Sequence, residues 1–134
     1  MEAHIEYKSG VQFAVDIRGH RLVCDQPTNA GGQDTGITPP EFLLASLGTC
    51  AGYYAVEYLK TRSLATEGVR VSVHAEKALN PGRLSRFQID VEVDGLTDDR
   101  HREGVLRAVK RCLIHNTLLH APEIEVGVHA PVTM

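Results

Sequence analysis

One segment near the middle of the chain reads as a long helix that is apolar around almost its whole circumference. Residues 38–62 read TPPEFLLASLGTCAGYYAVEYLKTR. Thr38 is a good N-cap, Pro39 suits the first helical position, and Glu41 completes a capping box. A helix that is hydrophobic on all sides is a buried helix, so the rest of the chain is expected to fold around this one.

Gly48 and Gly52 flank Cys50 in the middle of this helix. Each glycine costs roughly 1 kcal/mol relative to alanine in a helix interior. Two explanations account for them: close packing of the helix against another element, or access to the Cys50 sulfur.

The residues before the helix alternate between apolar and polar side chains, a pattern that predicts strands. Residues 4–8, 11–18 and 21–25 form three such runs. In the second run one face is expected to be half-buried, and it carries Val11, Phe13, Val15 and Ile17. Residues 26–37, QPTNAGGQDTGI, have turn composition throughout and predict a loop that leads into the helix.

After the helix, residues 69–76 and 87–94 alternate around an Asn80-Pro81-Gly82 turn, which predicts an antiparallel hairpin with one apolar face. Asp98 can cap a second helix over residues 99–113, on which Cys112 is expected to face inward. A further helical turn over residues 116–120 and a last strand follow; the strand is indicated by Ile124, Val126 and Val128.

Composition narrows the function classes. The chain has 134 residues, which predicts a single domain over residues 1–134. A net charge of −3 without clustered Lys and Arg does not suggest a nucleic-acid partner. No secretory leader is expected, and the long helix is too polar for a membrane span. Three widely spaced cysteines favour a reducing cytoplasmic location over a disulfide scaffold.

The long helix also carries an expectation about assembly. A helix that is apolar on all sides needs cover on all sides, and the other elements of a chain this small provide little. We therefore expect a second copy of the chain to complete the cover in a two-fold homodimer.

Two motifs resemble the OsmC/Ohr family of thiol peroxidases and their relatives. The first is DQPTNAGGQDTGITPPEFLLASLGTC, residues 25–50, with an acidic residue and proline, a Gly-rich loop and a helix that reaches Gly-x-Cys. The second is CLIHNTL, residues 112–118, similar to the family's Cys-x-x-x-Asn-Thr-Leu. The order of predicted elements agrees over nearly the whole chain. The resemblance implies an α+β fold in which antiparallel sheets pack around two long cysteine-bearing helices of an intertwined homodimer.

The resemblance also implies an activity, the reduction of organic hydroperoxides without a cofactor. Cys50 would attack the peroxide, Cys112 would resolve the resulting sulfenic acid to a disulfide, and an external dithiol would reduce that bond. In the best-known branch an N-terminal arginine pairs with the first thiolate and with the helix-entry glutamate. Arg18 and Arg21 are the candidates for that arginine here, and Glu41 is the matching glutamate.

Elementary chemistry explains why such a cation is needed. The nucleophile is the thiolate, and an ordinary cysteine, with a pKa of about 8.5, is only a few per cent ionised at neutral pH. Cys50 lies too far into its helix to gain from the dipole. Glu41 and Cys50 fall on opposite faces, about 13 Å apart along the axis, so Glu41 could orient an arginine or serve only as the capping carboxylate.

Other interpretations of the same residues stay open. Cys50, Cys112 and His115 could form a three-ligand zinc site, although His115 also suits a helix end. The tyrosines Tyr53, Tyr54 and Tyr58 could line an apolar ligand pocket or simply belong to the core. A binding module for a small molecule or metal, without peroxidase activity, is therefore the alternative function. Cys24 is interpreted as a small buried or half-buried apolar residue.

Overall fold

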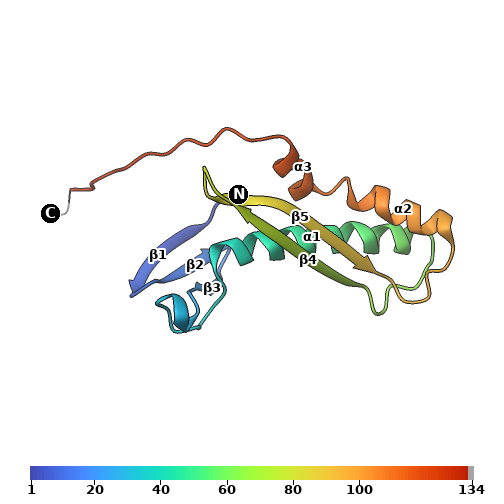
Figure 1. The fold of residues 1–134 in the computed structure, drawn as a ribbon, viewed down its shortest axis with the longest axis horizontal. Coiled ribbons are helices and arrows are strands. Elements are labelled where there is room, and N and C mark those ends of the chain that lie inside the picture. Colours follow the sequence, from blue (N-terminus) through green and yellow to red (C-terminus); the bar gives the residue numbers. More distant parts are fainter. Residues whose placement is uncertain (133–134) are drawn as a thin grey trace.

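The long helix predicted from the sequence forms the centre of the fold. In a computed structural model, which describes residues 1–132, helix α1 spans Pro39–Thr61. The capping box forms as predicted: Thr38 Oγ1 accepts a hydrogen bond from the Glu41 amide at 3.4 Å, and Glu41 Oε1 accepts one from the Thr38 amide at 2.9 Å. Figure 1 shows the other elements arranged along this helix.

Within one chain, only part of the circumference of α1 is covered. The fully buried residues recur every fourth position and form one stripe: Leu47, Ala51, Ala55 and Leu59. Tyr53, on another side, remains 63% exposed. The expectation of all-round burial is thus not met by a single chain, because the hairpin and α2 cover one side of the helix.

The N-terminal strands form a three-stranded antiparallel sheet in the order β1-β2-β3. The strands span His4–Ser9, Gln12–Ile17 and His20–Cys24. On the face expected to be half-buried, Phe13 and Ile17 are 38% and 39% exposed and Val15 is half-buried, whereas Ala14 on the other face is buried. The strand positions were predictable from alternation, and part of this apolar face stays open to solvent.

The predicted hairpin is confirmed. Strands β4 (Arg70–Ala78) and β5 (Arg83–Glu92) pair with Val73 opposite Ile89. The apolar face of this hairpin packs on α1 opposite Gly48 and Gly52. A Cβ atom added at Gly48 would lie 3.0 Å from a methyl group of Val73, and one added at Gly52 would lie 3.5 Å from a methyl group of Val71. Close packing therefore explains Gly48, whereas a methyl group at Gly52 would make only an ordinary contact.

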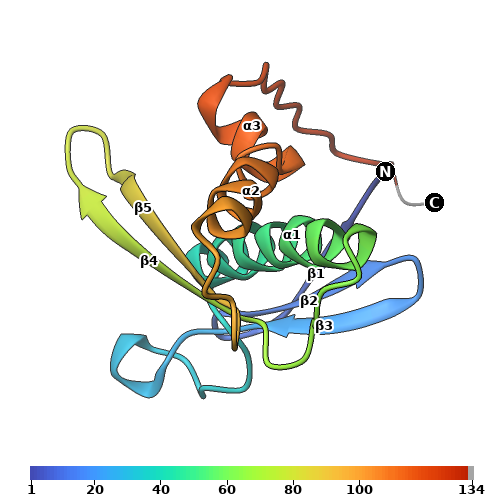
Figure 2. The ribbon, with the colours of Figure 1, turned by 90° about the vertical axis from the view of Figure 1, so that its right-hand side faces the viewer.

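The second helix is shorter than predicted. Helix α2 spans Asp99–Val109 with Asp98 as its N-cap, and helix α3 spans Leu113–Leu119. Cys112 does face inward, but it lies at the break between the two helices with an extended backbone (φ −56°, ψ 134°) rather than on a long helix. Figure 2 shows α2 against α1, with α3 continuing beyond it. Val105 and Val109 of α2 join Ala51, Ala55 and Leu59 in the core.

The predicted last strand is wrong for this chain. Residues 121–132 contain no strand, and Ile124, Val126 and Val128 are 81–95% exposed. Figure 1 shows this segment running away from the body of the molecule. A strand needs a neighbouring strand for its backbone hydrogen bonds, and none lies beside this segment.

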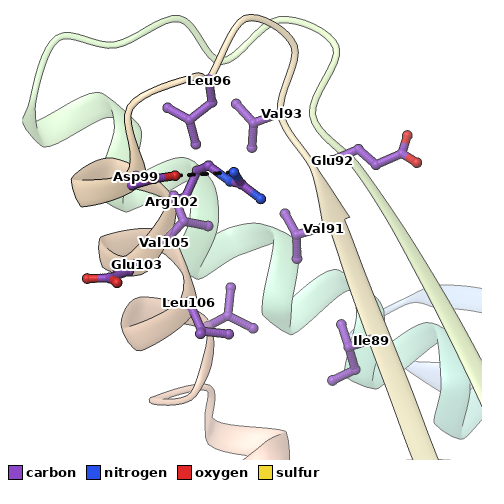
Figure 3. A pocket seen from close by; sticks show the side chains of 11 residues that line it. Ile89, Val91, Glu92, Val93, Leu96, Asp99, Arg102, Glu103, Val105 and Leu106 are labelled. Carbon is purple, nitrogen blue, oxygen red and sulfur yellow. Dashed lines mark hydrogen bonds and ion pairs between the residues drawn. The ribbon is translucent and has the colours of Figure 1, made fainter.

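An open groove of about 750 Å³ lies between β5 and α2; its floor is apolar, and Glu92, Asp99, Arg102 and Glu103 also line it. Figure 3 shows Ile89 and Val91 of β5 facing Val105 and Leu106 of α2 across it. Leu106 is 54% exposed, so this groove is a second apolar surface that the chain leaves uncovered.

Candidate functional site

The two cysteines predicted to act together meet where α3 begins. Cys50, in the middle of α1, is half-buried, whereas Cys112 is only 1% exposed. The two thiols are in contact, and the Cys50 side chain raises the pKa of the Cys112 thiol. Residues 62 positions apart in the sequence thus bring two free thiols together, because α3 packs against α1.

Opposing effects act on the pKa of the Cys112 thiol. Burial raises it most, and the hydrogen bond to Cys50 raises it further. The backbone amides of His115 and Ile114, at the start of α3, favour the thiolate and lower the pKa, but the net shift is upward. Cys112 therefore holds its proton at neutral pH.

Glu41 lies elsewhere and is engaged by the helix cap. Its carboxylate accepts hydrogen bonds from the amide and the hydroxyl of Thr38, at 2.9 and 2.8 Å, and the amide hydrogen bond is the larger of the two causes that lower its pKa. The structure thus places Glu41 at the N-terminus of α1 as a capping residue, not beside Cys50.

Arg18 and Arg21 also lie away from the thiols within one chain. Arg18 lies in the turn between β2 and β3 with a positive φ of 52°. Arg21 lies on β3, and its backbone is opposite that of Asp16 in the strand register. Both side chains are exposed, and within residues 1–132 neither forms an ion pair. Figure 1 shows this sheet at the N-terminal end of α1, away from α2.

Asp25 organises the loop that leads into α1, a role that sequence analysis missed. It is fully buried, and its carboxylate accepts hydrogen bonds from the Thr35 hydroxyl at 2.6 Å and from the amides of Gln26, Gln33 and Thr35. These bonds, the Thr35 hydroxyl foremost, hold its pKa far below the ordinary range. The only signal in the sequence is an acidic residue directly before a Gly-rich loop.

The same loop tolerates no side chain at Gly32. A Cβ there would overlap the Gln26 carbonyl oxygen and approach Asp25 Oδ1 to 2.7 Å. The Asp25 amide also donates to the Ile37 carbonyl at 3.2 Å. This loop therefore ties the end of β3 to the start of α1 and fixes how the cysteine-bearing helix enters the fold.

Two cavities flank α3. One, of about 420 Å³, lies against β5 and α1; its apolar lining includes Leu47, Phe87, Ile89, Leu118 and Leu119, and its polar lining is Ser85, Arg86 and His115. The other, of about 440 Å³, lies on the opposite face of α3, where Tyr54, Arg111, Leu113 and Asn116 meet. Leu47 and Tyr54 lie about one turn to either side of Cys50 on α1, but neither cavity is lined by Cys50 or Cys112.

The tyrosines on α1 have separate roles. Tyr58 packs on the core, and its hydroxyl lies 3.1 Å from His101 Nδ1 of α2. Tyr54 lines the second cavity, whereas Tyr53 is exposed. They do not line one common pocket.

Neither a metal centre nor a role for the third cysteine emerges. Among residues 1–132, no group of three or more His, Cys, Asp or Glu side chains is placed to hold a metal ion, which speaks against zinc on Cys50, Cys112 and His115.

Cys24 is the last residue of β3 and is half-buried; burial and the neighbouring Asp25 raise the pKa of its thiol. No helix within the described part of the chain is long and apolar enough to cross a membrane.

Comparison with known proteins finds one family and a consistent fold. A family model described as OsmC-like protein matches residues 31–127. No curated protein matches the chain by sequence.

Three solved structures illustrate the likeness in fold. A Psychrobacter arcticus protein described as an osmotic stress induced and detoxification response protein has a TM-score of 0.78 at 16% identity, over 86% of this chain and 85% of that one. An OsmC-like protein from Mycoplasma pneumoniae has a TM-score of 0.77 at 17% identity, over 90% and 87%. A Legionella pneumophila organic hydroperoxide resistance protein has a TM-score of 0.64 at 16% identity, over 90% of each chain.

Proposed function

Because the chain belongs to the OsmC-like family, we propose that it is a cysteine-based peroxidase that reduces organic hydroperoxides. The observation that carries this proposal is the contact between a half-exposed Cys50 and a buried Cys112. A peroxide can reach the first thiol, and the second lies within reach of the product that would form there.

The chemistry balances in three steps. The Cys50 thiolate attacks the outer peroxide oxygen, the O–O bond breaks, and an alcohol leaves with a proton while Cys50 becomes a sulfenic acid. The Cys112 sulfur then attacks the Cys50 sulfur and releases water, which forms the Cys50–Cys112 disulfide. A dithiol returns two electrons and two protons by thiol–disulfide exchange.

The apolar cavity beside β5 suits the organic part of the substrate. It lies one turn from Cys50 at Leu47, and Phe87, Ile89, Leu118 and Leu119 offer surface for an alkyl or aryl group. Burial of such a group stabilises the complex by about 25 cal/mol per Å² of apolar surface. Alkyl hydroperoxides should therefore be preferred over hydrogen peroxide.

A homodimer would complete both the fold and the site. The apolar face of β1–β3, the groove between β5 and α2, and the extended segment 121–132 are all uncovered in one chain. A two-fold partner that covers them would form an intertwined dimer. It could also bring Arg18 or Arg21 of a second copy to Cys50. We place this reduced thiol chemistry in the cytoplasm.

The test is peroxide consumption with a lipoyl-type dithiol as the reductant. Wild-type protein should consume an alkyl hydroperoxide, and Cys50→Ser should abolish turnover. Cys24→Ser, which removes a thiol outside the pair, is the matched control and should retain turnover. If fully reduced wild-type protein is no faster than Cys50→Ser, the peroxidase proposal fails and a binding module with buried cysteines replaces it.

A further inference from the structure

The turn of the β4–β5 hairpin combines positive charge with an exposed leucine. Residues 77–86 read KALNPGRLSR and contain three cations and no acid, in a chain whose net charge is −3. Lys77 and Arg83 form no ion pair within residues 1–132, and Arg86 pairs with Glu76 at 3.5 Å between two exposed side chains. Leu79 is 80% exposed. The hairpin therefore ends in a basic turn with an apolar residue in it.

Arg83 keeps its charge beside this leucine. Its Nη1 donates hydrogen bonds to the carbonyl oxygens of Leu79 and Pro81, at 3.3 and 2.9 Å. The side chain thus folds back over the turn instead of extending into solvent. A cation and an exposed leucine consequently lie together at the end of the hairpin.

Helix α3 adds two more exposed leucines on the same side of the molecule. Leu118 and Leu119 are 41% and 67% exposed, and they share the cavity of about 420 Å³ with Leu84 and Arg86 of β5. Figures 1 and 2 both show the hairpin turn and α3 on the upper side of the molecule. We call the following residues the hairpin-tip patch: Lys77, Leu79, Arg83, Arg86, Leu118 and Leu119.

The nearest acidic segment lies apart from this patch. Residues 121–132 carry Glu123 and Glu125, and Figure 2 shows this segment leaving α3 on the side away from the hairpin. Cations near the end of an edge hairpin also discourage unwanted strand pairing, which accounts for Lys77 and Arg83. It does not account for three exposed leucines beside them, because exposed apolar groups favour association.

We propose that the hairpin-tip patch docks reversibly on an anionic lipid surface. The cations would meet the negative headgroups, and the leucines would enter the interfacial region. Charge complementarity favours an anionic partner, and a projecting turn with leucines can enter a soft lipid layer without the shaped groove that a protein partner would have to supply. The proposal depends on the exposed surface and not on the peroxidase chemistry.

Such a contact is peripheral and differs from a membrane span. One basic residue near an anionic surface strengthens binding by about fivefold, so a few cations and leucines give weak attachment that salt can reverse. The cavity that Leu84 and Arg86 share with α3 belongs to the same patch. In the docked protein this cavity would lie beside the lipid, where apolar molecules concentrate.

The experiment measures partition of the reduced protein onto lipid vesicles by sedimentation, without peroxide. Vesicles of phosphatidylcholine mixed with phosphatidylglycerol supply the anionic surface, and vesicles of phosphatidylcholine alone are the neutral comparison. At low ionic strength the wild-type protein should bind the mixed vesicles and bind the neutral ones at least about fivefold more weakly. High salt should remove the difference.

Variants locate the contact. Lys77→Gln and Arg83→Gln should each lower partition onto the mixed vesicles by about fivefold, and Lys77→Gln does so without touching the hydrogen bonds of the turn. Leu79→Ser should lower it several-fold, because less apolar surface leaves water. The controls are Arg100→Gln, an equal charge change at the start of α2, and Leu113→Ser, which changes another exposed leucine. Both should bind like wild type.

A fluorescent variant reports which residue enters the lipid. The chain contains no tryptophan, so Leu79→Trp introduces a single indole at the end of the hairpin. Its emission should shift to shorter wavelength with the mixed vesicles and stay unchanged with the neutral ones. Binding without this shift would mean that another face docks, and would overturn the proposal.

The remaining outcomes are equally decisive. Absence of binding to the mixed vesicles, or equal binding to both kinds of vesicle, would refute an anionic lipid partner. An equal loss in Arg100→Gln and Lys77→Gln would show that only the overall charge matters. Binding to polyglutamate without binding to the vesicles would assign the patch to an acidic protein and refute the lipid contact. Normal vesicle binding without peroxide turnover would refute the peroxidase proposal alone.

Discussion

The buried Cys112 thiol contacts Cys50, and this contact raises the pKa of the Cys112 thiol. One partner comes from the middle of α1 and the other from the break before α3, so the contact depends on how these helices pack. We expect these two sulfurs to be the pair that forms a disulfide. Cys24, at the end of β3, has no such contact with either thiol.

The first prediction is therefore which disulfide forms. Mild oxidation followed by peptide mapping should recover a Cys50–Cys112 crosslink and leave Cys24 as a free thiol. Cys24→Ser should give the same crosslink in the same yield. A dominant crosslink from Cys24 to either of the other cysteines would contradict the pairing.

A second prediction tests the resolving role of Cys112. Cys112→Ser cannot resolve a sulfenic acid, so one peroxide equivalent should leave a Cys50 sulfenic acid that dimedone labels. Wild-type protein under the same conditions should form the disulfide and take up little dimedone. Equal labelling of the two proteins would contradict the resolving role.

The sequence predicted where helices and strands lie better than it predicted which of their faces are covered. Alternation located β1 to β5, and the capping residues Thr38 and Asp98 located the starts of α1 and α2. These signals are local, because caps and periodicity depend on neighbouring residues. The break at Cys112 was missed because residues 99–113 keep a helical pattern of apolar residues, and only packing of α3 on α1 shows that the helix has ended.

In the candidate site, too, the residue types could be predicted from the sequence but their contacts could not. Cys50 and Cys112 could be paired through a family resemblance, but their hydrogen bond depends on tertiary contact. Asp25 was missed because its partners lie in a loop without periodicity, where Thr35 is ten residues away. Arg18, Arg21 and Glu41 were assigned by analogy, and one chain does not bring them to Cys50.

A third prediction uses the helix glycines. Gly104→Ala should destabilise the protein by about 1–3 kcal/mol, because the new methyl would overlap the Tyr58 ring and disturb the Tyr58–His101 contact. Gly52→Ala is the matched change in α1, where the methyl makes an ordinary contact with Val71. It should leave stability unchanged or raise it by up to about 1 kcal/mol. Urea unfolding measures both; equal effects would contradict the packing.

The fourth prediction concerns assembly. Phe13 lies on the open face of β2, where a glutamate would bring a charge into the proposed dimer interface. Sedimentation should show wild-type protein at about twice the 14.7 kDa chain mass, and Phe13→Glu should weaken association by at least about tenfold. Ser9→Glu, which adds the same charge at the end of β1, should remain dimeric. A monomeric wild type at micromolar concentration would refute the dimer.

The last prediction follows from the lowered pKa of Asp25. In the folded protein its carboxylate is held ionised by Thr35, Gln26 and Gln12, whereas in the unfolded chain it titrates near the ordinary value of about 4. The folded pKa is depressed, so the stabilisation is complete above the unfolded pKa and is lost as pH falls through and below it.

Asp25→Asn should therefore be less stable than wild type at neutral pH by several degrees in Tm, because an amide offers one acceptor oxygen where the loop supplies several donors. The difference should narrow steadily as pH falls below about 4. Asp34→Asn, in the same loop but with an exposed side chain, is the control and should follow the wild-type curve. Thermal melts over an acidic pH series measure this, and a gap between Asp25→Asn and wild type that stays constant down to low pH would show that the Asp25 charge does not stabilise the loop.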